Sequence, residues 1–203
     1  MVYQKEMYLV CRIKTGYSYC LNISLLPKSC RSGILFTKSF LFFSSLLYFW
    51  SMKTVIQRVT HASVTIDGKV HGAIDQGFMI LVGIIDSDTE ETVSKMAAKI
   101  AKLRVFEDSQ GKMNLALKDI NGSVLSISQF TLYADCHKGN RPSFAGAGAP
   151  AYAEKMYLYF NECLRREGIR TEEGIFGADM KVELLNDGPV TICLDSKELF
   201  PNI

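Results

Sequence analysis

The stretch SVLSISQFTL, residues 123–132, decides the fold and the candidate site of this 203-residue chain. Its first half is apolar and partly β-branched, which is typical of a strand in the middle of a sheet. Polar Ser128 and Gln129 then interrupt the apolar run. We therefore predict a central strand over residues 123–131 that carries polar groups at its carboxyl end.

Residues 52–203 around this stretch predict an α+β domain. Further strands are expected at 55–59, 63–66, 69–74, 78–85, 104–107, 181–185 and 190–194. The pair Asp67-Gly68 predicts a two-residue hairpin turn, and NDGP at 186–189 predicts a turn between the last two strands.

Two helices are expected in the same region. The first follows residues 87–89, each of which could cap it, and the second spans 151–166 with Pro150 in its first turn. Residues 134–150 are rich in Gly, Pro, Ala and Ser, which predicts a long loop.

The first 51 residues differ from the rest. They hold six basic residues and one acidic residue, a net charge of +5, so residues 52–203 carry −3. The apolar stretch 39–50 follows basic residues like a signal peptide, but it is short for a bilayer span, which takes about 20 residues. We interpret residues 1–51 as an N-terminal extension, either upstream sequence from a wrong start or disordered, with a genuine extension as the alternative. Met52 then begins the domain, 52–203.

Composition excludes several chemistries. The six cysteines form no CxxC pair, and His61, His71 and His137 lack the spacing of a metal site, so we expect neither metal nor cofactor. Cys163 and Cys193 are expected to pack in the core. An acidic body argues against a grip on long nucleic acid, and we expect a cytoplasmic protein that binds neither DNA nor a membrane.

Five segments together resemble a known family. They are QRVTHASV (57–64), GKMN (111–114), SQFTL (128–132), KGNRPSF (138–144) and NDGPVT (186–191). In order and spacing they closely resemble the D-aminoacyl-tRNA deacylases, or D-tyrosyl-tRNA(Tyr) deacylases, the editing hydrolases that free tRNA from D-amino acids. The resemblance implies a homodimer of single compact domains, each with mainly antiparallel β-sheets forming a barrel-like core and two helices.

The resemblance also implies site residues. Ser128, Gln129, Phe130 and Thr131 would line the pocket for the 3′-terminal adenosine of the tRNA acceptor end. Backbone N–H groups near Gln129 and Phe130 would stabilise the oxyanion, while a water assisted by the ribose 2′-OH attacks. Thr131 lines the site, and we assign it no nucleophile role. Without the family, polar residues at a strand end are solvated edge positions or turn formers.

The Gly188-Pro189 peptide would be cis and would enter the partner subunit's site. There it would reject L-amino acids sterically while sparing D-amino acids and glycine. Arg58 would support this segment, although a solvent-facing strand residue is the plain alternative. Met113 and Asn114 would lie near the pocket, although alone they suggest a tight turn.

The loop motif KGNRPSF completes the implied site. Phe144 would border the adenosine, and Lys138 and Arg141 could contact phosphates or only be solvated.

Two other functions stay open at this point. A related deacylase of the same fold acts on L-alanyl-tRNA, although Ser128 and the NDGPVT context favour the D-specific branch. A non-catalytic domain that binds RNA ends would keep the adenosine pocket without turnover.

Overall fold

The computed structural model describes residues 8–12, 18–22 and 51–201, and the chain divides into two units, Met1–Phe49 and Trp50–Ile203. In the first unit, β1 (Tyr8–Arg12) and β2 (Ser18–Asn22) pair as antiparallel strands. The prediction for residues 39–50 falls outside the described ranges, and the interpretation of residues 1–51 as an extension stays a prediction.

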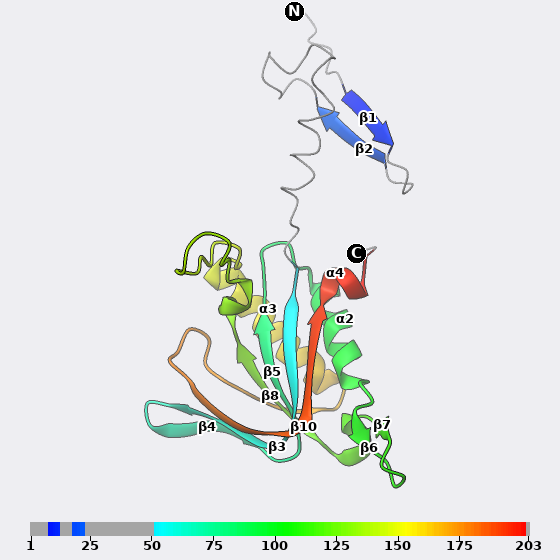
Figure 1. The fold of residues 1–203 in the computed structure, drawn as a ribbon, viewed down its shortest axis with the longest axis vertical. Coiled ribbons are helices and arrows are strands. Elements are labelled where there is room, and N and C mark those ends of the chain that lie inside the picture. Colours follow the sequence, from blue (N-terminus) through cyan, green and yellow to red (C-terminus); the bar gives the residue numbers. More distant parts are fainter. Residues whose placement is uncertain (1–7, 13–17, 23–50, 202–203) are drawn as a thin grey trace, which may run out of the picture. The chain divides into compact units, whose positions relative to one another are not determined.

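The second unit is built on one six-stranded sheet (Figure 1). Its strands are β3 (Lys53–Ile66), β4 (Lys69–Ile74), β5 (Gly77–Gly83), β8 (Ser123–Ser128), β9 (Arg170–Glu173) and β10 (Lys181–Asp195). The order is β10-β3-β5-β8-β9, with β4 also paired to β3. The pairs β5–β8 and β8–β9 are parallel, and the pairs that involve β3 are antiparallel.

Strand β3 is continuous over 14 residues, so the predicted break between residues 59 and 63 is wrong. The strand changes partner there: its first half pairs with β5 as far as Val59, and its second half pairs with β4 from Ala62. The Asp67-Gly68 turn is confirmed, with positive φ at both residues (49° and 75°), which is the geometry of a type I′ hairpin.

Strand β5 is buried on both faces, as its apolar sequence predicts. Phe78, Ile80 and Val82 enter a large core that the helices cover, while Met79 belongs to a second, smaller core on the other face. The smaller core is closed by β4, because Gly72 lies close to the backbone of Glu173 on β9. The sheet therefore curls into a nearly closed barrel.

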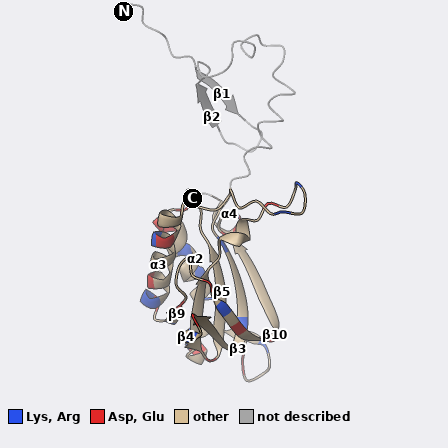
Figure 2. Cartoon of the chain, turned by 90° about the vertical axis from the view of Figure 1, so that its left-hand side faces the viewer, with Lys and Arg blue, Asp and Glu red and all other residues tan. Residues whose placement is uncertain are grey.

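Both expected helices are present and lie on one side of the sheet (Figures 1 and 2). They are α2 (Glu90–Ala101), which Thr89 caps, and α3 (Pro150–Arg166), which starts with proline. A third short helix, α4 (Ser196–Leu199), is not predicted. In residues 8–12, 18–22 and 51–201, no helix combines the length and apolar character needed to cross a lipid bilayer.

Short elements fill the connections. Strands β6 (Phe106–Glu107) and β7 (Met113–Leu115) pair, so the strand predicted at 104–107 is shorter than expected. The 3₁₀ helices η3 (Leu117–Ile120) and η4 (Phe130–Tyr133) flank β8.

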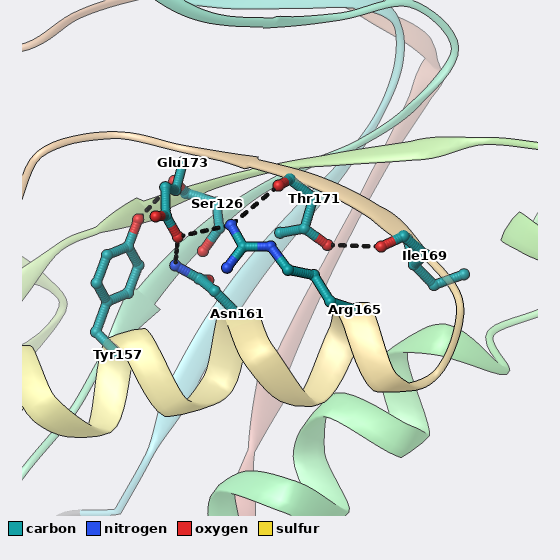
Figure 3. Close-up of polar contacts among 7 residues, drawn as sticks. All are labelled: Ser126, Tyr157, Asn161, Arg165, Ile169, Thr171 and Glu173. Atoms are coloured by element: carbon teal, nitrogen blue, oxygen red, sulfur yellow. Dashed lines mark hydrogen bonds and ion pairs between the residues drawn. The ribbon is translucent and has the colours of Figure 1, made fainter.

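A polar network joins α3 to β8 and β9 (Figure 3). Asn161 and Arg165 both donate to Glu173 Oε2, at 2.6 and 3.0 Å, and Arg165 also donates to the carbonyl of Thr171. Tyr157 donates to the carbonyl of Ser126 at 2.7 Å. Because Ser126 lies two residues before the end of β8, this network holds the strand end that carries the candidate site.

Asp88 joins the start of β3 to the end of β5. It is 3% exposed, and its two carboxylate oxygens accept hydrogen bonds of 2.8 Å from the backbone N–H groups of Met52 and Ile85. Burial is the largest influence on this group and raises its pKa to about 6. Asp88 is one of the three residues that were expected as helix caps. It serves instead as a buried clamp, and Thr89 caps the helix.

The raised pKa predicts a pH dependence of stability. Because the folded state holds this proton more tightly than the unfolded state, the stabilisation is complete below the ordinary value of 3.8 and is lost as the pH rises through about 6. Between pH 4 and pH 7, the free energy of unfolding of the wild type should fall relative to Asp88→Asn by on the order of 2 to 3 kcal/mol. Urea unfolding across this range measures it.

The matched control is Asp75→Asn, an exposed carboxylate outside the clamp, which should keep the wild-type pH dependence. Parallel curves for the wild type and Asp88→Asn would contradict the prediction.

Candidate active site

The segment 128–131 lies at the carboxyl ends of two adjacent parallel strands, β5 and β8. The strand ends at Ser128, because Gln129 leaves the sheet (φ −145°, ψ 87°) and the chain turns into η4. The predicted strand over 123–131 is therefore three residues too long. Loops at the carboxyl ends of parallel strands are a common place for ligand sites.

Two backbone N–H groups are free at this turn. The N–H of Gln129 is occupied, because it donates to the carbonyl of Val82 at 2.8 Å. In the described part of the chain, no hydrogen bond uses the N–H of Phe130 or Thr131. Of the donors expected near Gln129 and Phe130, the N–H of Gln129 is therefore used within the sheet, whereas the N–H of Phe130 is unused.

Aromatic and polar side chains surround these donors. Gln129 donates its side-chain amide to the hydroxyl of Thr131. The ring of Phe130, which is 57% exposed, meets the ring of Phe144 edge to face at a centroid distance of 5.2 Å. The structure therefore brings the SQFT and KGNRPSF motifs into contact. In the sequence, only the family resemblance associated them.

The loop 134–150 is held at several points. Asp135 and Ser143 exchange backbone hydrogen bonds of 2.7 and 2.9 Å, and the N–H of Ala149 donates to Asp86 at 2.7 Å. The predicted phosphate contacts Lys138 and Arg141 are exposed on the part of the loop between Asp135 and Ser143.

An Asp135–His137 pair in this loop is not predicted. His137 Nδ1 lies 2.5 Å from Asp135 Oδ1, and hydrogen bonds from the backbone and side chain of His137 lower the pKa of Asp135. The Asp-x-His spacing is the only signal in the sequence that could have indicated it.

The NDGP segment is not a hairpin turn, so that prediction is wrong. Both flanks belong to β10 and pair with the same strand, β3: Asn186 lies opposite Val59 and Thr191 lies opposite Gln57. Residues 187–190 therefore stand opposite one residue of β3. They form an enlarged bulge on an edge strand, which we call the Gly-Pro bulge.

The Gly-Pro bulge has an unusual backbone. The Gly188-Pro189 peptide is cis, as the resemblance implies, and Gly188 has φ +127°, a conformation that L side chains rarely adopt. A Cβ at this position would also lie 2.8 Å from the side chain of Val190. Glycine is thus required here on two independent grounds.

Arg58 anchors the Gly-Pro bulge through its buried side chain. It is 4% exposed, so the alternative of a solvent-facing strand residue is wrong. Its Nε lies 3.1 Å from the carbonyl and 3.2 Å from Oδ2 of Asp187, and its Nη1 donates to the carbonyl of Val105 at 2.6 Å. A buried guanidinium needs such partners, and here they lie on two separate segments.

Asn186 closes the neck of the bulge. Its Nδ2 donates to Gln57 Oε1 at 2.8 Å, and its Oδ1 accepts from the backbone N–H of Val190 at 2.9 Å. Sequence reasoning assigned Asn186 and Asp187 to a turn and missed this supporting role, although both residues stand in the NDGP motif.

Met113 and Asn114 lie in β7, not in a tight turn; the turn is at 108–112. Met113 is 55% exposed, and the carbonyl of Asn114 accepts from Arg104 Nε at 2.7 Å. Since Arg104 precedes Val105, these two residues adjoin the Arg58 anchor and not the SQFT segment.

The predicted site residues therefore form two separate groups in one protomer. By strand register, Ser128 lies level with Thr54, four residues from Arg58. The bulge strand is three strand spacings from β8. The groups are therefore about 13 Å apart along the sheet and about 14 Å apart across it.

The cysteines of the domain differ in burial. Cys163 is buried as expected, but Cys193 is exposed on β10, so the prediction that it packs in the core is wrong. Among residues 8–12, 18–22 and 51–201, no three His, Cys, Asp or Glu side chains are grouped to hold a metal ion.

Comparison with known proteins gives consistent matches. The model of the family described as D-Tyr-tRNA(Tyr) deacylase matches residues 55–195. A D-aminoacyl-tRNA deacylase of Geobacillus sp. (strain WCH70) is 55% identical over 147 residues, 72% of this chain and 97% of that protein. One of Halothermothrix orenii is 54% identical over 149 residues, 73% of this chain and all of that protein.

A solved structure named c-Myc DNA Unwinding Element Binding Protein is also similar. It has a TM-score of 0.66 and 44% identity, and the match covers 70% of this chain and 97% of that chain. Since the family model covers well over half of the chain and the bacterial relatives align over nearly their full lengths, the chain belongs to the D-Tyr-tRNA(Tyr) deacylase family.

Proposed function

We propose that this protein hydrolyses the ester that joins a D-amino acid to the 3′-terminal adenosine of tRNA. Membership of a hydrolase family supports the reaction class. The structural observation that carries the proposal is the pair of unused N–H groups of Phe130 and Thr131, beside exposed aromatic rings that could border an adenosine. No metal or cofactor enters the reaction.

In the proposed reaction, a water molecule attacks the ester carbonyl carbon. The N–H groups of Phe130 and Thr131 stabilise the oxyanion, and the carbon–oxygen bond to the ribose then breaks. The ribose oxygen takes a proton, which yields free tRNA and the D-amino acid. In this proposal the ribose 2′-OH assists the water, and Thr131, whose hydroxyl accepts from the side-chain amide of Gln129, only lines the site.

The Gly-Pro bulge selects the stereochemistry in this proposal. Main-chain carbonyls of Gly188 and Pro189 receive the α-amino group and occupy the space that an L side chain needs. Selection by exclusion spares D-amino acids of many kinds, and it also spares glycine, which has no side chain to reject. Glycyl esters, such as glycine mischarged on tRNA-Ala, are therefore expected substrates.

The bulge reaches the site of a partner subunit, so the active form is a homodimer. Two observations support this step. Within one protomer the bulge is too far from Ser128 to share a substrate, and both Gly188 and Pro189 are exposed. Strand β10 is also a 15-residue sheet edge with an apolar side chain, Leu185, that is 55% exposed, and such edges favour pairing with another chain.

Two other functions remain as outcomes of the test. An L-alanyl-tRNA deacylase of the same fold would cleave L-alanyl esters, and a domain that only binds RNA ends would cleave none. A cytoplasmic location follows from the substrate, since translation supplies aminoacyl-tRNA there.

The substrate panel is the first prediction from the proposed function. With the full-length protein, D-Tyr-tRNA and Gly-tRNA should be hydrolysed while L-Tyr-tRNA and L-Ala-tRNA persist, because only the L side chains meet the bulge. Release of labelled amino acid measures each rate. Cleavage of L-Ala-tRNA alone would support the related deacylase, and tRNA binding without any cleavage would support the binding domain.

The second prediction tests the backbone donors with a matched pair of variants. Phe130→Pro removes both the ring and the N–H at the first position of η4, where proline is tolerated. Phe130→Ala removes only the ring. Loss of one oxyanion donor should lower kcat for Phe130→Pro by about 100- to 1000-fold relative to Phe130→Ala. Equal kcat values in two folded variants would remove the Phe130 N–H from the mechanism.

The third prediction concerns the anchor of the bulge. Arg58→Lys keeps the charge but cannot reach the carbonyls of Val105 and Asp187 together. It should lower kcat/KM for D-Tyr-tRNA by roughly 10- to 100-fold, since a planar fork is replaced by a point charge. Arg170→Lys, at an arginine whose side chain is 67% exposed, is the control and should match the wild type. If both variants retain full activity, Arg58 does not position the bulge.

A further inference from the structure

A groove with a basic wall lies outside the site residues described so far. It has a volume of about 530 Å³ and runs along the second half of α2 and the segment that follows it. Its walls include Lys95, Lys99, Lys102 and Arg104, with Leu103 and Phe200 as apolar surface. We call these six residues the basic groove.

The positive charge of the basic groove is largely uncompensated. Lys95 pairs with Glu91 at 2.7 Å. In the described part of the chain, Glu91 is the one carboxylate within ion-pair distance of the four cationic groups of the basic groove. Lys99, Lys102 and Arg104 are all exposed. This concentration of cations stands out because residues 52–203 as a whole carry a net charge of −3.

Helix stability offers a plain explanation for part of this pattern. Lys99 lies in the last turn of α2 and Lys102 follows its end, where cations interact favourably with the helix dipole. This explanation does not extend to Arg104, which lies beyond the helix, nor to the apolar side chains that line the same groove. A dipole effect also predicts a change in melting temperature when the lysines are replaced, whereas a binding surface predicts a change in affinity for tRNA.

The segment that carries Arg104 is linked to the Gly-Pro bulge through Arg58. Arg104 precedes Val105, the carbonyl of Val105 accepts from Arg58, and Arg58 holds Asp187 in the bulge. In Figure 1, β6 and β7 lie beyond the lower end of α2. The buried side chain of Arg58 thus links the segment that carries Arg104 to the Gly-Pro bulge.

We propose that the basic groove binds the sugar–phosphate backbone of the tRNA acceptor arm. The inference rests on the proposed function, in which the bulge enters the partner's site. In this proposal the helix that ends in the reacting adenosine passes over the groove when Gly188 and Pro189 enter the partner's pocket. Ammonium and guanidinium groups suit phosphates, and Leu103 and Phe200 offer apolar contact to ribose.

This assignment explains how an acidic domain holds a polyanion. Non-specific affinity for nucleic acid comes mainly from cations that replace counterions at phosphates. One confined basic surface gives that affinity for a short helix, without a grip on long nucleic acid. It also leaves the sequence of the tRNA unread, which suits an enzyme that edits many tRNAs.

The test compares two double variants of the full-length protein. Lys99→Gln/Lys102→Gln removes two charges from the groove. The control, Lys69→Gln/Lys181→Gln, removes two exposed charges beside Thr65 and Ile66, where β3 ends. Binding of uncharged tRNA is measured by fluorescence anisotropy from low to moderate salt. The groove variant should bind about 10-fold more weakly at low salt, and its log–log salt slope should be shallower by roughly 1 to 2. The control variant should bind like the wild type.

A second measurement separates this proposal from the proposed function. A D-aminoacyl-CCA trinucleotide lacks the helix, so the groove variant should cleave it at the wild-type rate while its KM for D-Tyr-tRNA rises. Failure of the wild type to cleave either ester would overturn the catalytic proposal, whatever the salt slopes are. Unchanged tRNA affinity and slope in the groove variant would overturn the groove proposal, and a lowered melting temperature alone would assign the lysines to the helix dipole.

Discussion

Strand β5 has to satisfy two apolar cores at once, and the rest of the domain is arranged around this constraint. One face meets the helices and the other meets the inside of the barrel, so neither face can carry polar groups. Neighbouring strands must then cover both edges: β3 on one side and β8 on the other. Gly77 shows how closely they fit, because a Cβ there would overlap the carbonyl oxygen of Ser123. The site follows from this, since the chain can turn outward only where β5 and β8 end.

Several parts of the fold could be predicted because their signals are local. The Asp67-Gly68 hairpin, the two long helices and the doubly buried strand each depend on residues within one segment. The end of β8 could not be predicted, because it depends on the distant carbonyl of Val82, which takes the N–H of Gln129. The NDGP segment was misassigned for a related reason: a turn and a bulge contain the same residues, and only the pairing of both flanks with β3 distinguishes them.

The arrangement of the predicted site residues could not be derived from the sequence. The family resemblance indicated both motifs, but nothing in the sequence shows that Phe130 meets Phe144 while Met113 and Asn114 lie beside Arg58. The buried state of Arg58 was equally hidden, because an arginine in an alternating strand is more often exposed. In the proposed function, main-chain groups carry the chemistry, which is unusual for a hydrolase. Such groups are insensitive to most side-chain substitutions, and they depend instead on the path of the backbone.

The Gly-Pro bulge has a further consequence for how this family can change. Its two flanks are each paired with β3, so the sheet on both sides keeps its register whatever lies between Asn186 and Thr191. Residues added to or removed from the bulge would alter how far it projects without disturbing the barrel. Evolution can therefore adjust how far this segment projects independently of the fold that carries it. Under the proposed function, a designer who wished to admit or exclude a different acyl group would have the same freedom.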